Sequence, residues 1–215
     1  MPFDFIMRLN VANKISIFRI AVIPVFMLFY IVKTGAPAEI NYYKILAWFL
    51  FILGAISDLV DGYYARNYEK VTNFGKLIDP IADKMLVTAA LLCLVEDQKV
   101  ASWVAFLIIG RDISISGLRI IAAAHGHIIA ASPLGKWKTV LQLTAIITAL
   151  TFYSFDELLK LSGVINFFGG QAGAFITHYK LYEQPIVDVL MYSSAFLSLI
   201  SGYDYFRKNK NVIKD

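Results

Sequence analysis

The chain has 215 residues, of which 58% are hydrophobic and only 17% are charged, and its mean hydropathy is +0.63. A soluble domain of this length does not need so many apolar residues for its core, so the composition excludes an ordinary soluble protein and predicts a polytopic membrane protein. The net charge of +4 gives no indication of nucleic-acid binding, because the basic residues follow the distribution expected of membrane loops.

Six apolar stretches are near or above the ~20 residues that a helix needs to cross a bilayer. They cover residues 15–32, 43–64, 78–95, 103–124, 134–153 and 185–205. None alternates with the period of two that barrel strands show, so we expect an all-α bundle of six transmembrane helices, forming a single domain over residues 1–215. A short amphipathic segment beside the membrane is expected before the first helix. The segment 156–183 is expected to be an interfacial or partly re-entrant loop.

The distribution of lysine and arginine predicts the orientation in the membrane. These residues gather in the N-terminal segment, in the loops after the second and fourth spans, and in the C-terminal tail. Basic loops stay on the cytoplasmic side, so we expect a multi-pass protein of the cell (inner, cytoplasmic) membrane with both termini facing the cytoplasm. The same basic segments are expected to attract anionic membrane lipids.

Four aspartates, Asp58, Asp61, Asp79 and Asp83, lie where the second span ends and the third begins. At ~100° per residue each pair falls on one helix face, so two antiparallel helices could direct four carboxylates at one point. At the edge of a bilayer such a cluster must protonate, pair with cations or bind metal. An all-oxygen ligand set favours a hard ion such as Mg²⁺ or Mn²⁺. Because Pro80 follows it, Asp79 is expected at or beside the N-cap of the third span.

The residues between the two aspartate pairs suit a diphosphate ligand. Gly62, Ala65 and Gly75 leave room for a ligand to approach the backbone, and the Arg66 guanidinium matches the geometry of phosphate oxygens. In full, the pattern reads Asp58-x2-Asp61-Gly62-x2-Ala65-Arg66-x8-Gly75-x3-Asp79-x3-Asp83. This pattern resembles the signature of the CDP-alcohol phosphotransferases, integral membrane enzymes that join a CDP-linked group to an alcohol and release CMP.

A second polar region spans the fourth and fifth apolar stretches and contains the basic residues Arg111, Arg119, Lys136 and Lys138. Two interpretations stay open from the residues alone. The first is a pocket for a second, anionic phosphate. The second is an ion pair of Arg111 with Asp112 or with the aspartate cluster, the lysines being ordinary cytoplasmic-side charges.

Two regions resemble the phosphatidylglycerophosphate synthase branch of that family. One comprises the runs RDISISGLR, from residue 111, and SPLGKWKTVLQ, from residue 132. The other is the segment 10–19, in which Ala12 and Ser16 depart from the proline and threonine of that branch. The resemblance places Asn13 close to the nucleotide diphosphate.

The resemblance implies transfer of the phosphatidyl group of CDP-diacylglycerol to glycerol 3-phosphate. It implies two Mg²⁺ or Mn²⁺ ions per site, with Asp83 as both metal ligand and general base. It also implies a homodimer. The implied metal ligands are Asp58, Asp61, Asp79 and Asp83. The implied CDP-diacylglycerol contacts are Asn13, Asp61, Gly62, Ala65, Arg66 and Gly75. The implied glycerol 3-phosphate contacts are Arg111, Arg119, Lys136 and Lys138.

Three alternatives stay open. A sister enzyme of the family would use serine, inositol phosphate or another alcohol as acceptor. A membrane prenyltransferase also binds magnesium and diphosphate through aspartates, but it would need a second aspartate-rich motif. A cation transporter would place its carboxylates near the bilayer midplane and would have no use for Arg66 or the glycines.

Overall fold

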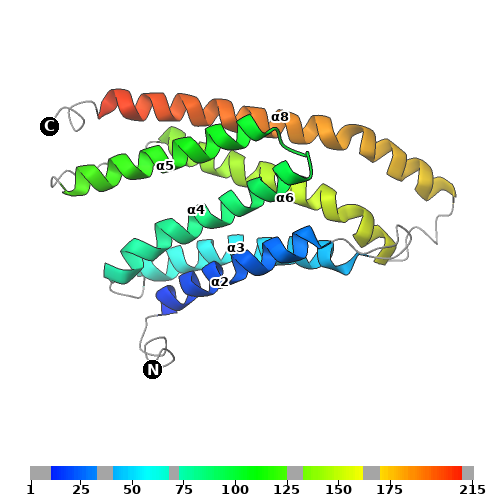
Figure 1. Cartoon of the computed structure of the whole chain (residues 1–215), viewed down its shortest axis with the longest axis horizontal. Helices are drawn as coiled ribbons and strands as arrows, with labels where there is room; N and C mark the ends of the chain where they lie inside the picture. Colours follow the sequence, from blue (N-terminus) through cyan, green and yellow to red (C-terminus); the bar gives the residue numbers. More distant parts are fainter. Residues whose placement is uncertain (1–10, 33–40, 68–72, 125–132, 162–169, 210–215) are drawn as a thin grey trace. The chain divides into compact units, whose positions relative to one another are not determined.

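The computed structural model describes residues 11–32, 41–67, 73–124, 133–161 and 170–209 (Figure 1). Within these ranges the chain forms six α-helices and no strand, so the expected all-α class is confirmed for them. The helices are α2 (Val11–Ile31), α3 (Tyr42–Asn67), α4 (Asn73–Glu96), α5 (Ser102–Ala124), α6 (Pro133–Leu161) and α8 (Gly170–Lys208). The amphipathic segment expected before the first span falls outside the described residues.

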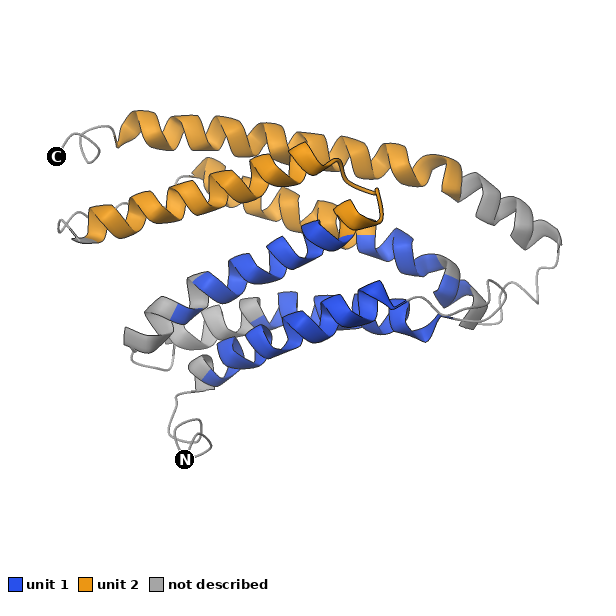
Figure 2. Ribbon diagram, in the orientation of Figure 1, with its two compact units in different colours: residues 1–93, 150–173 blue, residues 94–149, 174–215 orange. Residues whose placement is uncertain are grey.

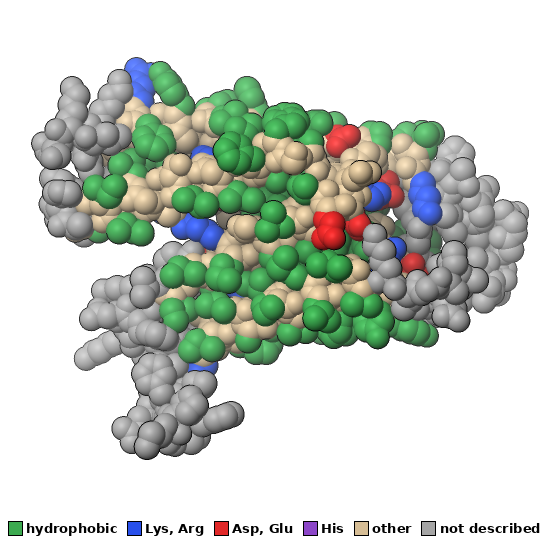
Figure 3. All heavy atoms as spheres, viewed as in Figure 1, with side chains coloured by type: hydrophobic (Ala, Val, Ile, Leu, Met, Phe, Trp, Pro, Cys, Tyr) green, Lys and Arg blue, Asp and Glu red, His purple; other side chains and the backbone are tan. Residues whose placement is uncertain are grey.

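Two described segments are long and apolar enough to cross a membrane, Lys14–Ile31 in α2 and Lys180–Lys208 in α8. Large apolar side chains also lie exposed on the helices, and Figure 3 shows hydrophobic side chains spread over the face in view. Phe106, Ile120 and Tyr203 are each at least 70% exposed. Together with the composition, these features indicate a membrane protein, whereas the six-span arrangement stays a prediction.

The expectation of a loop over residues 156–183 is wrong. Helix α6 continues to Leu161 and α8 begins at Gly170, so helix occupies much of this segment. Glycine costs a helix only ~1 kcal/mol relative to alanine, and a backbone in apolar surroundings gains more by satisfying its hydrogen bonds within a helix. Pro185, which was taken as the start of the last span, lies inside α8.

The expected N-cap position of Asp79 is also wrong. Helix α4 begins at Asn73, so Asp79 and Pro80 lie about two turns inside it. Proline removes one backbone N–H donor from the helix, and helices in apolar surroundings tolerate this loss where neighbouring groups compensate. The backbone therefore continues the helix beyond the second aspartate pair, toward the connection with α3.

The chain forms two compact units, shown in different colours in Figure 2. Unit 1 comprises residues 1–93 and 150–173, and unit 2 comprises residues 94–149 and 174–215. Helix α6 contributes its first part to unit 2 and its second part to unit 1. The expectation of a single domain over the whole chain stays a prediction.

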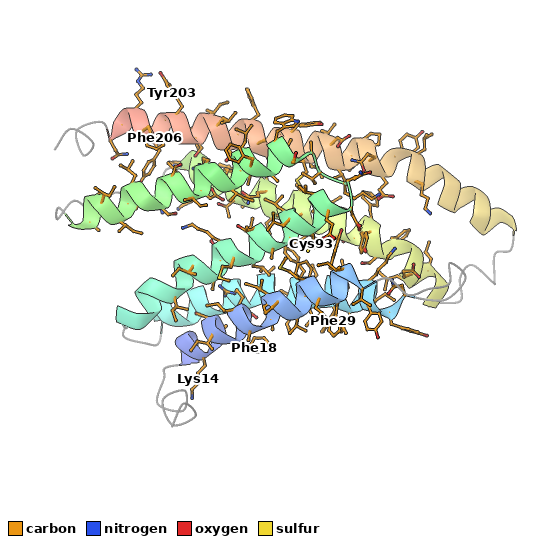
Figure 4. The ribbon with its side chains drawn as sticks, in the orientation of Figure 1. Lys14, Phe18, Phe29, Cys93, Tyr203 and Phe206 are labelled. Carbon is orange, nitrogen blue, oxygen red and sulfur yellow. The ribbon has the colours of Figure 1, made fainter. Side chains whose placement is uncertain are left out.

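Aromatic rings hold α2 against its neighbours in unit 1. Helix α2 packs along α3, and their contacts pair later residues of α2 with earlier residues of α3, so the two helices are antiparallel. Phe29, labelled in Figure 4, takes part in this packing. The ring pairs and centroid distances are Phe26–Phe51 at 5.7 Å, Phe29–Tyr43 at 5.8 Å and Tyr30–Tyr153 at 4.5 Å.

A polar cluster joins the start of α3 to the later part of α6. Asn41 caps α3, because its side-chain oxygen accepts a hydrogen bond from the Tyr43 N–H at 3.1 Å. The Asn41 N–H in turn donates to the buried Glu157 carboxylate at 3.1 Å. The Lys44 ammonium lies 3.8 Å from the same carboxylate, and Ser154 donates to the Lys44 carbonyl. The buried charge of Glu157 is therefore compensated, as burial requires.

Gly54 lets α3 and α4 approach each other closely. A Cβ atom at this position would lie 3.2 Å from both terminal methyl groups of Leu86. We expect Gly54→Leu to destabilise the protein by about 1–3 kcal/mol, because overpacking forces the two helices apart. Gly110→Leu is the control, since a Cβ there meets no described atom within 4 Å. Thermal unfolding in detergent measures both variants, and equal melting temperatures would contradict the close approach.

Unit 2 brings α5 and α8 together in parallel. Trp103 stacks on Tyr192 with ring centroids 5.6 Å apart, and further along both helices Ile115 and Leu118 form a buried cluster with Tyr205. At the turn before α5, the Lys99 ammonium lies 2.6 Å from Glu183, and the Gln184 amide donates to the Lys99 carbonyl. These contacts set the register in which α5 presents its polar residues to α8.

Candidate active site

The backbone brings the two aspartate pairs to one end of unit 1. Helices α3 and α4 are joined by residues 68–72 alone, so the end of α3 must lie near the start of α4. The Gly54–Leu86 contact sets the register of this antiparallel pair. Counting equally along both helices from that contact, Asp61 lies about level with Asp79.

By the same register, Asp58 lies about level with Ala82, the residue before Asp83. Asp83 is half-buried and has an interaction partner. The side chains of the other predicted residues of this region lie outside the described part of the structure: Asn13, Asp58, Asp61, Gly62, Ala65, Arg66, Gly75 and Asp79. The roles assigned to all of these residues stay predictions.

The donor set of the aspartate pairs suits a divalent cation. If the four carboxylates converge, they would give the all-oxygen ligation that Mg²⁺ and Mn²⁺ prefer, and the backbone of the two helices places the four residues within about one turn of each other. The residues whose side chains are described contain no group of three or more His, Cys, Asp or Glu that could hold a metal. Since the side chains of Asp58, Asp61 and Asp79 are not among them, the metal stays a prediction.

A fully buried arginine lies in the same unit. Arg19 of α2 is 0% exposed, as is Ser16 one turn earlier. Because α2 and α3 run antiparallel with Phe26 beside Phe51, Arg19 lies within about one turn of the level of Asp58. A buried guanidinium requires polar or anionic partners, and Arg19 does have an interaction partner. Its positive charge therefore lies near the aspartate end of unit 1.

Unit 2 gathers two of the four basic residues around one carboxylate. The Lys138 ammonium of α6 lies 2.6 Å from both oxygens of Asp112 in α5. The Arg111 guanidinium lies 3.0 Å from one of these oxygens. Lys138 is only 2% exposed. The ion pair between Arg111 and Asp112, which one interpretation of the sequence expected, is thus present, and it brings a second cation with it.

Helix α8 supplies the other wall of this cluster. The second terminal nitrogen of Arg111 donates to the Ser201 hydroxyl at 2.6 Å. Gly202 makes room for the arginine, because a Cβ there would lie 3.2 Å from the Arg111 Cγ. Two turns further along α5, Arg119 donates from Nε to the Tyr205 hydroxyl at 3.0 Å, with its guanidinium 5.4 Å from the centre of the Tyr205 ring.

The four predicted phosphate-binding residues therefore have three different kinds of surroundings. Arg111 and Lys138 share Asp112, Arg119 is held by Tyr205 on the same face of α5, and Lys136 is exposed at the start of α6. Sequence reasoning gave no role to Ser201 or Tyr205. The sequence does carry a pattern that could have indicated this face of α8. Buried hydroxyl residues recur on it every three or four positions, at Ser194, Ser198, Ser201 and Tyr205.

Comparison with known proteins identifies the family to which the chain belongs. Residues 9–173 match the model of the CDP-alcohol phosphatidyltransferase family. A Bacillus subtilis protein named CDP-diacylglycerol–glycerol-3-phosphate 3-phosphatidyltransferase is 34% identical, over 95% of this chain and 97% of its own. Proteins of the same name from Rickettsia bellii and Haemophilus influenzae are 36% and 30% identical, each over at least 94% of both chains. The chain belongs to the CDP-alcohol phosphatidyltransferase family.

Proposed function

We propose that the protein transfers the phosphatidyl group of CDP-diacylglycerol to sn-glycerol 3-phosphate, giving phosphatidylglycerophosphate and CMP. The observation that carries this proposal is the similarity, over nearly the whole chain, to several proteins that bear the name of this enzyme. The cations gathered around Asp112 in unit 2 support it, because the acceptor is an alcohol that carries a phosphate dianion.

The donor substrate is assigned to the aspartate end of unit 1. Arg66 and Asn13 would hold the diphosphate, and Asp61 would also contact the nucleotide. Gly62, Ala65 and Gly75 would leave space for the cytidine. Two Mg²⁺ or Mn²⁺ ions held by Asp58, Asp61, Asp79 and Asp83 would neutralise charge on the diphosphate.

Asp83 is assigned as the general base. Its carboxylate takes the proton from the C1 hydroxyl of glycerol 3-phosphate. The resulting oxygen attacks the phosphorus that carries the diacylglycerol group. A new P–O bond forms on one side of that phosphorus while the bond to the CMP oxygen breaks on the other, so that CMP leaves in line with the attack.

The acceptor phosphate is assigned to unit 2. Arg111 and Lys138 supply charged donors from a partly closed environment, and Arg119 adds a third cation on the same face of α5. Lys136 is exposed and contributes mainly long-range attraction for the dianion. A serine acceptor would have no phosphate for these cations, whereas an inositol phosphate acceptor would.

The membrane arrangement follows the sequence pattern. The six apolar stretches would span the cell membrane, with both termini and the active site on the cytoplasmic side, where the basic loops lie. CDP-diacylglycerol would keep its acyl chains in the surrounding lipid. A homodimer is proposed on the family resemblance alone.

The test is an acceptor assay with the purified protein in mixed micelles of CDP-diacylglycerol. Labelled glycerol 3-phosphate, serine and inositol phosphate are offered separately, with Mg²⁺ and with a chelator. We expect Mg²⁺-dependent labelling of lipid from glycerol 3-phosphate, with one CMP released per lipid formed. Labelling from serine or inositol phosphate instead would show a sister enzyme. A transporter would release no CMP, and a prenyltransferase would release diphosphate from a prenyl donor.

A further inference from the structure

Asp112 is the centre of the basic cluster in unit 2. Both of its oxygens lie 2.6 Å from the Lys138 ammonium, and one of them lies 3.0 Å from the Arg111 guanidinium. The side chain of Lys138 is only 3% exposed and that of Asp112 is 18% exposed. The ion pair is therefore largely removed from solvent, unlike the exposed pair of Lys208 with Asp204 in the same unit.

A lysine in this environment depends on its partner. Removing an ammonium from water costs several kcal/mol, and only a close counter-charge offsets this cost. The lysine stem is a flexible chain of four carbons, so the ammonium also needs a bonding partner that holds it in one place. Asp112 is both the counter-charge and this bonding partner, through two oxygens on one ammonium.

Arg111 is fixed by the same carboxylate and by α8. One terminal nitrogen bonds Asp112 and the other bonds Ser201, with Gly202 packed against the stem. The remaining donor of this fork, Nε, is buried and has no hydrogen-bond partner among the described residues. A buried N–H without a partner is costly, and an oxygen atom of a bound ligand would satisfy it.

We propose that Asp112 is a positioning residue for the acceptor phosphate. It keeps Lys138 charged and holds it beside Arg111, so that the two cations present their donors to a phosphate dianion in a preset geometry. This inference rests on the proposed function, because that function supplies the phosphate-bearing acceptor. Asp112 itself does not touch the acceptor, and its effect passes through Lys138 and Arg111.

The first experiment measures the KM for each of the two substrates in the variant Asp112→Asn. We expect the KM for glycerol 3-phosphate to rise roughly 10–100-fold, the range for losing a charged hydrogen bond, while the KM for CDP-diacylglycerol stays unchanged. Asp112→Glu, which keeps the charge, should recover part of the loss. Asp204→Asn is the matched control, because it removes an exposed carboxylate–lysine pair of unit 2 and should leave both KM values unchanged.

Two results of this experiment would overturn the proposal. A lower KM for glycerol 3-phosphate in Asp112→Asn would show that the carboxylate competes with the phosphate for the cations. A reduced kcat with unchanged KM values would place Asp112 in the chemical step or in general stability instead.

A double variant tests whether the effect passes through Lys138. In Asp112→Asn/Lys138→Gln both charges are absent, which relieves the uncompensated buried charge of the single variant and favours folding. We expect its KM for glycerol 3-phosphate to be no higher than that of Lys138→Gln alone, because coupled residues are not additive. If the rise in this KM in the double variant equals the product of the rises in the two single variants, Asp112 does not act through Lys138.

A binding measurement separates this inference from the proposed function. If the wild-type protein forms no lipid from glycerol 3-phosphate, the proposed function fails. Calorimetric titration with inorganic phosphate still tests Asp112, since we expect the wild-type protein to bind phosphate at least 10-fold more tightly than Asp112→Asn. Equal binding by the two proteins would overturn the role of Asp112.

Discussion

Replacing Asp83 by asparagine should lower kcat by roughly 10²–10⁴-fold, which is the range expected when a general base is removed. Asparagine has nearly the same size as aspartate, but its amide oxygen cannot accept a proton from the attacking hydroxyl and is a weaker metal ligand. Asp83 lies half-buried in α4, next to Ala82, which lies about level with Asp58 along the helix pair. Initial rates at saturating substrates, measured across a range of Mg²⁺ concentrations, check this prediction.

Asp188→Asn is the matched control for this prediction. Asp188 is half-buried in α8, belongs to unit 2 and accepts a hydrogen bond from the Gln184 amide at 3.0 Å. We expect its activity to stay close to that of the wild-type protein. If Asp83→Asn retains near-normal kcat while folding normally, Asp83 is not the base. If excess Mg²⁺ restores its rate fully, Asp83 serves as a metal ligand and another group takes the proton.

Lys138→Gln should raise the KM for glycerol 3-phosphate roughly 10–100-fold, whereas Lys136→Gln should change it only a few-fold. The two lysines lie two residues apart on α6, but Lys138 is 2% exposed and bonded to Asp112, and Lys136 is exposed. A surface charge acts through screened, long-range attraction, and its effect should shrink further as salt is added. A desolvated ammonium at fixed distance makes a stronger charged hydrogen bond.

Steady-state kinetics at low and high salt measure both lysine variants. The ratio of the two KM changes is the informative quantity, since both variants lose one positive charge from the same helix. Equal KM changes would show that the acceptor is attracted by total charge and not by a built site. Loss of the folded protein in Lys138→Gln is tested separately by its melting temperature, because in that variant Arg111 is the cation left beside Asp112 among the residues that the structure describes.

Helix positions were largely predictable from the sequence because they depend on local and compositional properties. Each of the six apolar stretches overlaps a described helix, and the first five match their helix to within one residue at one end or at both, as with residues 103–124 and α5 (Ser102–Ala124). The aspartate pairs were also visible, since helical period places residues three or four apart on one face. The close approach of α3 and α4 at Gly54 and Leu86 places the helix segments that carry the two pairs side by side, whereas the meeting of the four carboxylates stays a prediction.

The errors at the segment 156–183 and at Asp79 have a common cause. Glycine, proline and N-cap residues change the free energy of a helix by only about 1–3 kcal/mol each, and in the prediction from sequence they were read as signals that a helix ends. In apolar surroundings every backbone N–H and C=O must find a partner inside the protein, and continuing the helix achieves this. Helix α8 therefore runs through Gly173 and Pro185, and α4 runs through Gly75 and Pro80.

By itself, the sequence determined the helical class, the apolar character and the spacing of the aspartates, because each of these depends on residues close together in the chain. Only the tertiary structure decided that Asp112 holds Lys138, 26 residues away, and that Ser201, 90 residues from Arg111, holds the other side of the arginine. Several anionic partners were open to Arg111 in the sequence. Packing of α5, α6 and α8 selected one of them, since a charge removed from water must be paired by whichever groups the folded helices bring within hydrogen-bonding distance.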